Sequence, residues 1–199
     1  IFRGKHCHHN SGVGLWADID NVGLTFENNT IEDNESCGIR HEISFGAVIW
    51  NNTVRRNGYG ATNGVWRTKD PSAAGQGDYF ARTGSPFMTS GININCSGGV
   101  AGDSMATIEV YDNTVEYNQN GIFLQQRNRG TSVEYPARFY LTQNVKVHDN
   151  HVTVTARTGD QWGDNVSGLG AYEEPPAGTR RDFFYNWGNV LQNNTYYVD

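Results

Sequence analysis

Asn51-Asn52-Thr53 repeats the stretch Asn28-Asn29-Thr30 at a distance of about 23 residues. Looser copies follow further along the chain, at Asp112-Asn113-Thr114, Asp149-Asn150-His151 and Asn193-Asn194-Thr195. Recurrence at a fixed spacing is typical of stacked architectures, in which one repeat cannot bury its apolar face alone. We therefore expect the fold to follow from the repeat, and the function from the positions that depart from it.

Each copy is preceded by a segment with apolar residues at every second position. Gly14-Leu15-Trp16-Ala17-Asp18-Ile19-Asp20 aligns with Gly38-Ile39-Arg40-His41-Glu42-Ile43-Ser44, and further copies begin at Gly91, Gly121 and, more weakly, Gly168. This alternation is the period of a half-buried strand. It predicts that Leu15, Ala17 and Ile19 face inward. Trp16, Asp18 and Asp20 are then predicted to face outward.

Two more short strands follow in each copy, and three strands in about 23 residues leave no room for a helix. Strands that recur at one-coil spacing stack like on like, so each coil adds a parallel strand about 4.8 Å from the last. The predicted fold is an all-β parallel β-helix. Stacked asparagines can then hydrogen-bond amide to amide. Two such ladders are predicted: Asn29, Asn52, Asn113, Asn150 and Asn194, and Asn10, Asn34, Asn57 and Asn118.

The pattern resembles the right-handed parallel β-helix repeat proteins of bacteria, within the superfamily that includes pectate lyases and other polysaccharide lyases, epimerases, polygalacturonases and phage tailspikes. The stretches that carry the resemblance are Gly14 to Asn21, Gly38 to Ser44 with Asn51 to Val54, and Asn120 to Gln126. The resemblance implies a right-handed helix of about five to six coils. It does not name one activity, because a shared fold hosts many chemistries. The polygalacturonase and alginate epimerase signatures are absent from the sequence.

The coils are interrupted by long insertions near 58–90, 127–143 and 157–189, which lack the alternation and are rich in Gly, aromatic residues and Arg. Loops on a rigid scaffold are where binding residues concentrate, although these loops could equally serve only to cover the solenoid flank. We expect residues 1–199 to form a single β-helix domain that lacks N-terminal coils or a cap.

The composition limits the classes of partner that the protein can bind. A net charge of −6 argues against nucleic acid, and no apolar run is long enough for a membrane span. Abundant Gly and Asn with only 18% charged residues suit an extracellular or cell-surface β-solenoid, and self-association through the helix ends is an open alternative. Three cysteines at irregular spacing predict no disulfide framework, with Cys7 and Cys96 at inward positions.

The candidate catalytic residues are Asp18, Asp20, Glu42 and Arg40, all on the outward face of the first strand of the coil. Asp18 and Asp20 share a face, and Glu42 lies over Asp18 one coil later. Two carboxylates at one-coil distance repel each other unless something compensates. The compensating group could be Ca²⁺ held by Asp18, Asp20 and Glu42, a proton on one carboxylate, or an ion pair with Arg40.

Three interpretations of this cluster stay open. In a lyase, a metal ion or arginine neutralises a uronate carboxylate, and Arg40, Lys5 or Arg127 removes the adjacent proton. In a glycoside hydrolase, two of the three carboxylates act as acid and as base or nucleophile. In the third interpretation, the charged side chains are solvated groups and turn caps on the surface of the solenoid.

Neighbouring outward positions supply the candidate substrate-binding residues, which are Trp16, Asn93, Asn95, Gln125 and Arg127. Alternation places His41 inward, in register with Ala17, which favours a core histidine over a general base. His6 and His8 share a face with Glu32 lying over His8, and these three residues are a candidate Zn²⁺ site.

The sequence therefore predicts a secreted β-helix protein that binds, and in the enzyme interpretations cleaves, an extracellular polysaccharide or oligosaccharide. The lyase-like and glycosidase-like interpretations remain alternatives to each other. The non-catalytic alternative is a carbohydrate-binding or structural solenoid, such as an adhesin or a tailspike-type component.

Overall fold

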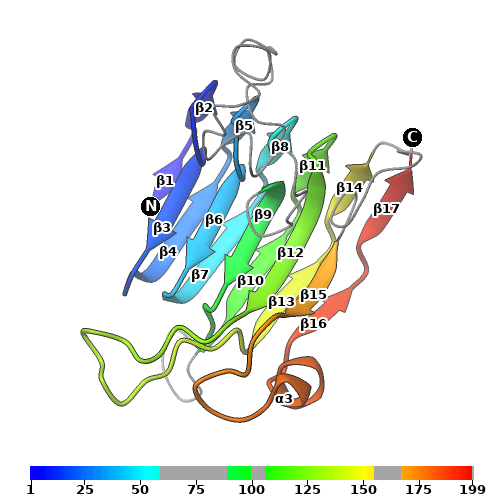
Figure 1. The fold of residues 1–199 in the computed structure, drawn as a ribbon. Coiled ribbons are helices and arrows are strands. Elements are labelled where there is room, and N and C mark those ends of the chain that lie inside the picture. Colours follow the sequence, from blue (N-terminus) through cyan, green and yellow to red (C-terminus); the bar gives the residue numbers. More distant parts are fainter. Residues whose placement is uncertain (59–88, 100–105, 155–166, 199) are drawn as a thin grey trace, which may run out of the picture.

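The computed structural model describes residues 1–58, 89–99, 106–154 and 167–198, and these residues form three parallel sheets that run side by side along one axis (Figure 1). Sheet A contains β1 (Phe2–Arg3), β4 (Val22–Glu27), β7 (Phe45–Trp50), β10 (Ile108–Tyr111), β13 (Val145–His148) and β16 (Val190–Gln192). Sheet B contains β2 (His6–His8), β5 (Thr30–Glu32), β8 (Thr53–Arg55), β11 (Thr114–Glu116), β14 (His151–Val154) and β17 (Thr195–Val198). Sheet C contains β3 (Leu15–Asp18), β6 (Ile39–Glu42), β9 (Ser90–Asn95), β12 (Asn120–Gln126) and β15 (Gly168–Ala171).

Successive coils pair in the predicted register, with every strand pair parallel. Leu15 pairs with Ile39, which pairs with Ile92, and Val54 lies between Ile31 and Val115. The inward side chains of all three sheets form one apolar core that runs along the axis. Because fully burying an Ile or Val side chain is worth about 1.5–3 kcal/mol, this column of stacked aliphatic residues dominates the stability of the solenoid.

Both predicted asparagine ladders are present. In the first, the side-chain amide of Asn29 donates to Asn52 (2.9 Å), Asn52 to Asn113 (2.9 Å) and Asn113 to Asn150 (2.9 Å). The backbone N–H of each of these residues donates to the same acceptor oxygen at 3.0 Å. The second ladder runs through Asn10, Asn34, Asn57 and Asn118.

The residue before each asparagine of the first ladder adopts a left-handed backbone, which explains why that position is always Asn or Asp. The φ angles are 54° at Asn28, 52° at Asn51, 52° at Asp112 and 54° at Asp149. Asn and Asp tolerate this region better than other non-glycine residues. The repeated Asn-Asn and Asp-Asn pairs therefore encode the turn from sheet A to sheet B.

The prediction for Ile19 is wrong. Ile19 is 53% exposed and, with Asp20, has a φ of 55°, so the chain turns directly after β3. The alternation therefore ends at Asp18. Asp20 lies in the turn and not on the outward face of the strand.

The three predicted insertions differ in how much of them the structure describes and in which elements they contain. The segment near 58–90 lies almost wholly outside the described residues, as do 157–166 of the third insertion. Residues 127–143 connect β12 to β13 without a regular strand, in a stretch that the structure describes in full. The rest of the third insertion contains β15 and a short helix, α3 (Arg180–Tyr185), which begins with a capping box of Thr179 and Asp182 and buries Phe183 in the main core. The expectation of no helix thus holds for the coils and fails in this connection.

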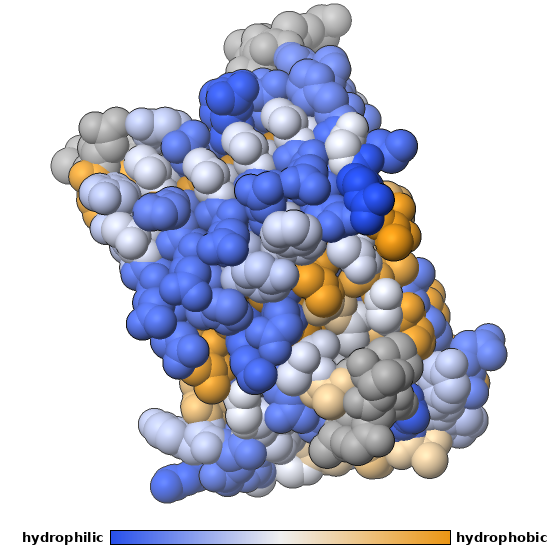
Figure 2. All heavy atoms as spheres, turned by 180° about the vertical axis from the view of Figure 1, so that it is seen from behind, coloured by the Kyte–Doolittle hydropathy of each residue, from blue (hydrophilic) through white to orange (hydrophobic). Residues whose placement is uncertain are grey.

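The face of the molecule opposite to that in Figure 1 is mainly polar. Seen from behind, hydrophobic residues reach the surface in small patches among hydrophilic ones (Figure 2). In the part of the chain that the structure describes, no helix is long and apolar enough to cross a membrane.

Candidate functional site

The outward face of sheet C brings Trp16, Asp18, Arg40 and Glu42 together. Trp16 pairs with Arg40 and Asp18 pairs with Glu42 in the ladder between β3 and β6. The Arg40 guanidinium lies 5.2 Å from the centre of the Trp16 ring, which is a cation–π contact. The predicted stacking of the two carboxylates, and of arginine on tryptophan, is confirmed.

Glu42 is held by three donors. Arg40 contacts its Oε2 at 2.7 Å, while Arg129 and the Asn95 amide contact its Oε1 at 2.8 and 2.7 Å. Both Glu42 and Arg40 are only 3% exposed. The two guanidinium groups and the amide compensate the charge of this buried carboxylate, which would otherwise be costly to bury. Of the three ways to compensate the stacked carboxylates that the sequence left open, the structure shows the ion pair with Arg40 for Glu42.

Asp18 has the opposite environment. Its Oδ1 is buried and has no hydrogen-bond partner in the structure. Burial and the neighbouring Glu42 carboxylate raise the pKa of Asp18, although Arg40 and Arg129 act in the opposite direction. Two adjacent carboxyl groups thus differ in their surroundings: Glu42 is paired with two guanidinium groups, whereas Asp18 takes up a proton more readily than an ordinary aspartate.

Asp20 does not join this pair. Its carboxylate accepts hydrogen bonds from Ser132 Oγ, the backbone N–H groups of Val133 and Glu134, and the Tyr140 hydroxyl. Burial acts to raise the pKa of Asp20, but these hydrogen bonds outweigh it and hold the pKa below its ordinary value. The structure therefore assigns Asp20 to the connection 127–143, which sequence alternation alone did not indicate.

The predicted substrate-binding residues divide into two groups. Trp16 is 50% exposed, and the side chain of Arg127 is 37% exposed and paired with Glu173 at 2.8 Å. Asn93, Asn95 and Gln125 lie on the predicted face of sheet C but are almost fully buried. The side-chain oxygens of Asn93 and Gln125 have no hydrogen-bond partner in the structure. Unpaired buried acceptors are costly, so this column is not optimised for stability alone.

The two predicted metal sets do not form clusters. Among the described residues, no group of three or more His, Cys, Asp or Glu side chains is placed to hold a metal ion. For the calcium set, the oxygens of Asp20 and Glu42 are already occupied by protein donors. For the zinc set, Glu32 is bound by Arg55, Arg56 and His6, which together with the electrostatic pull of Arg55 lower its pKa to about 2. His8 faces His9, with 2.8 Å between their Nδ1 atoms.

His41 is in the interior, as alternation predicted. It is fully buried, neither ring nitrogen has a hydrogen-bond partner in the structure, and burial lowers its pKa to about 4. A neutral imidazole in the core cannot act on a substrate at the surface, so His41 is excluded as a general base for this site.

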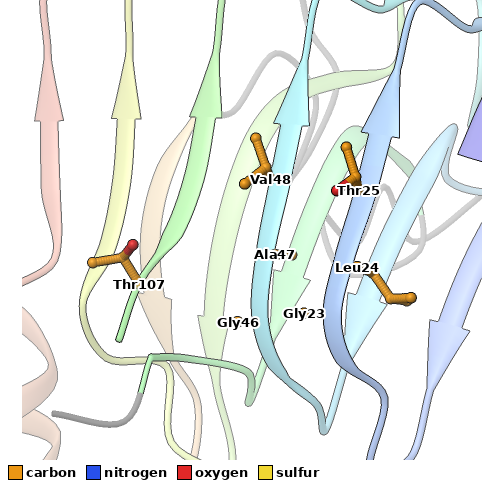
Figure 3. A pocket seen from close by; sticks show the side chains of 7 residues that line it. All are labelled: Gly23, Leu24, Thr25, Gly46, Ala47, Val48 and Thr107. Carbon is orange, nitrogen blue, oxygen red and sulfur yellow. The ribbon is translucent and has the colours of Figure 1, made fainter. Parts of the chain in front are cut away.

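A hollow of about 200 Å³ lies on sheet A, whereas Asp18 and Glu42 lie on sheet C. Its lining, Gly23, Leu24, Thr25, Gly46, Ala47, Val48 and Thr107, comes from β4, β7 and the residue before β10 (Figure 3). None of these lining residues is charged or titratable. The hollow therefore presents no acid, base or charged group to a ligand, and the outward face of sheet C remains the candidate site.

Arg129 is the site residue that no sequence pattern singled out. It belongs to an insertion noted for its arginines, but its contact with Glu42 joins residues 87 positions apart. The signal available in the sequence was the enrichment of Arg in 127–143, which does not say which arginine reaches the carboxylates.

Comparison with known proteins agrees with the fold. Residues 1–85 match the family model described as the right handed beta helix region. We found no match to the chain among curated proteins or among solved structures. The three parallel sheets continue the coil pattern beyond the matched residues, up to β17. The described residues thus form a parallel β-helix of several coils, and its first 85 residues are similar to the right handed beta helix region.

Proposed function

We propose that the protein is an extracellular or cell-surface solenoid that binds a polysaccharide through Trp16 and Asp18. The observation that carries this proposal is the pairing, on one face of β3, of a half-exposed indole ring with a carboxyl oxygen that lacks a partner. Side chains two apart on a strand are separated by about 6.5 Å, which is close to the width of one sugar ring.

The chemistry of the two side chains suits a sugar. An aromatic ring packs against the apolar face of a pyranose, and carboxyl oxygens accept hydrogen bonds from its hydroxyl rim. Arg40 covers one side of the Trp16 ring at 5.2 Å and fixes its orientation. The ring is thereby preorganised, and less side-chain entropy is lost when a ligand binds.

Binding to an array of acidic and neutral polysaccharides tests the proposal. Trp16→Ala and Asp18→Ala should each weaken the best interaction by about tenfold or more. Tyr185→Ala is the matched control, because Tyr185 is 76% exposed on α3 and distant in sequence from β3, which carries Trp16 and Asp18. Equal binding by the Trp16→Ala protein and the unchanged protein would rule out this surface.

A second candidate function is acid-assisted cleavage of the bound chain. It is favoured by the contrast between Asp18, whose pKa is raised, and Glu42 in the adjacent strand, whose carboxylate is paired with Arg40 and Arg129. A protonated carboxyl group next to an ionised one is the arrangement that glycosidases use to protonate the leaving oxygen and stabilise positive charge. The lyase interpretation lacks comparable support, because the guanidinium groups of Arg40 and Arg129 are paired with Glu42.

Turnover separates the two functions. Reducing ends and absorbance near 235 nm are followed on each bound polysaccharide, with and without calcium. Asp18→Asn resembles the protonated carboxyl group in shape, so it should keep binding and abolish release of reducing ends. Release that is unchanged in Asp18→Asn would contradict the catalytic role. Reducing ends that appear together with absorbance near 235 nm would identify a lyase instead, because β-elimination creates both an unsaturated sugar and a new reducing end.

A further inference from the structure

Residues 127–143, here called the strap, reach back along the helix axis after leaving β12. In Figure 1 this yellow-green connection extends past the lower ends of the strands toward the first coils. Its contacts with the turn after β3 join residues that are 112 to 120 positions apart. The strap therefore links the middle of the solenoid to its first coils.

The strap is fastened at Asp20. Ser132 Oγ and the Tyr140 hydroxyl donate to Asp20 Oδ1 at 2.5 and 2.9 Å. The backbone N–H groups of Val133 and Glu134 donate to Oδ2 at 2.9 and 3.0 Å. Four donors on one ionised carboxylate form a strong local anchor, since charge-assisted hydrogen bonds are about twice as strong as neutral ones.

The second attachment of the strap is at the candidate site itself. Arg129 contacts Glu42 at 2.8 Å, and its charge also acts on Asp18. The side chain of Glu42 is 3% exposed, whereas that of Arg129 is 36% exposed. Arg129 thus lies between the carboxylates and solvent.

The tip of the strap packs on the body of the molecule through Phe45, against which Tyr135 lies edge-on at 6.1 Å between ring centres and over which the Arg138 guanidinium lies at 5.8 Å, but much of its apolar surface is exposed. Val133 is 74% exposed, Tyr135 41% and Phe139 40%. Within the tip the backbone forms a small hairpin, with Ser132 N–H donating to the Arg138 carbonyl and Tyr140 N–H to the Gly130 carbonyl. Tyr140 itself is buried against Ile43, Phe45 and Cys96. Apart from these contacts with Phe45 and the buried Tyr140, the tip depends on its polar anchors at Asp20, so their loss should make it more mobile.

We propose that the strap is a lid over the Asp18–Glu42 pair, latched by Asp20, which holds Arg129 in place and limits access to the outward face of sheet C. Asp20 is then a positioning residue that acts through Arg129. The latch itself is independent of any ligand, whereas its effect on glycan access rests on the proposed function.

Hydrogen–deuterium exchange of the ligand-free protein tests the latch. In Asp20→Asn, amides of 128–139 should exchange about tenfold faster or more, while the core strands keep their protection. Asp149→Asn is the matched control, because Asp149 also ends a turn but bonds to His148 on sheet A. Unchanged exchange in 128–139 would overturn the proposal, as would equal acceleration in the control.

A milder variant guards against misfolding of Asp20→Asn. Tyr140→Phe removes one donor to Asp20 and keeps the ring stacked on Phe45, so exchange in the tip should rise by a smaller factor. The coupling to the site is measured by NMR titration of the Asp18 carboxyl carbon without ligand. Asp20→Asn and Arg129→Gln should both shift its midpoint upward, and a midpoint that moves in Arg129→Gln alone would show that Asp20 does not position Arg129.

Glycan binding is measured last. A latch that opens as described without any change in glycan affinity would contradict the access role and leave the latch standing. Loss of binding in Trp16→Ala with unchanged affinity in Asp20→Asn would separate the proposed function from the lid in the same way.

Discussion

The asparagine ladder and the outward column of sheet C are both vertical rows of polar side chains, yet they obey opposite rules. In the ladder, the same residue recurs in each coil, and each amide donates to its copy in the next coil. In the column, Asp18, Glu42, Asn95 and Gln125 occupy one row, and every coil supplies a different residue. Repetition satisfies hydrogen bonds, whereas variation leaves some unsatisfied, as at Gln125. Repeated positions therefore build the scaffold, and varied ones are free to carry function.

A row of aromatic side chains on sheet A resembles the ladder, because each ring packs on the ring of the next coil. Trp50, Tyr111 and His148 stack face to face at 5.9 and 5.2 Å between ring centres. Because each ring covers the face of the next, these rings offer their edges to solvent and not the faces on which a sugar packs. Trp16 differs because its stacking partner is a guanidinium group.

The largest expected effect is on the ladder. Asn52→Leu removes an amide that bonds to Phe26, Trp50 and Asn113 and an oxygen that accepts from Asn29. Several buried groups lose their partners at once, so we expect a loss of roughly 4 kcal/mol in the free energy of unfolding, measured with urea.

Asn194→Leu, at the last position of the same ladder, is the control for that change. Asn194 accepts from Asn150 and donates to the Val147 carbonyl, so fewer groups are orphaned and the loss should be about half as large. Equal losses at the two positions would contradict a ladder whose strength comes from partners on both sides.

His41 provides the second test, because it interrupts the apolar core with an unpaired ring. Its pKa of about 4 in the folded state lies below the ordinary value of 6.5, so the unfolded state takes up the proton first. The free energy of unfolding is therefore unaffected by protonation of His41 above about pH 6.5. As the pH drops toward 4, protonation of His41 in the unfolded state lowers this free energy by up to about 3 kcal/mol. Urea unfolding at pH 7 and 4.5 should show this loss in the unchanged protein and not in His41→Leu. Equal losses in both proteins would show that groups other than His41 cause the pH dependence.

The smallest effect is expected at Asn93 on sheet C. The same change, Asn to Leu, can be made there as in the ladder, so the two positions can be compared directly. Asn93 donates one 3.3 Å hydrogen bond to the Phe123 carbonyl, and its oxygen has no partner in the structure. Replacing an unsatisfied amide with an apolar group recovers part of its desolvation cost, so Asn93→Leu should change the free energy of unfolding by less than about 1 kcal/mol. A loss as large as that of Asn52→Leu would remove the distinction between the two rows.

Much of the molecule follows from the sequence by itself. The spacing of Asn29 and Asn52 fixes the coil, and alternation from Gly14 and Gly38 places Asp18 next to Glu42, Trp16 next to Arg40 and His41 inside. These features depend on contacts between neighbouring coils, and a period in the sequence reports such contacts directly.

Only the tertiary structure decided the rest. The alternation that groups Asp20 with Asp18 breaks at the left-handed turn of Ile19, and the partners of Asp20 are more than 110 residues away. The pairing of Arg129 with Glu42, and the burial of Asn93, Asn95 and Gln125 at an outward face, likewise arise where other parts of the chain meet sheet C. Such contacts carry no period, because an insertion packs against whatever surface its length and polar anchors allow it to reach. The repeat in the sequence thus determines the scaffold. The surroundings of Asp18, Asp20 and Glu42 depend on how the insertions pack against that scaffold.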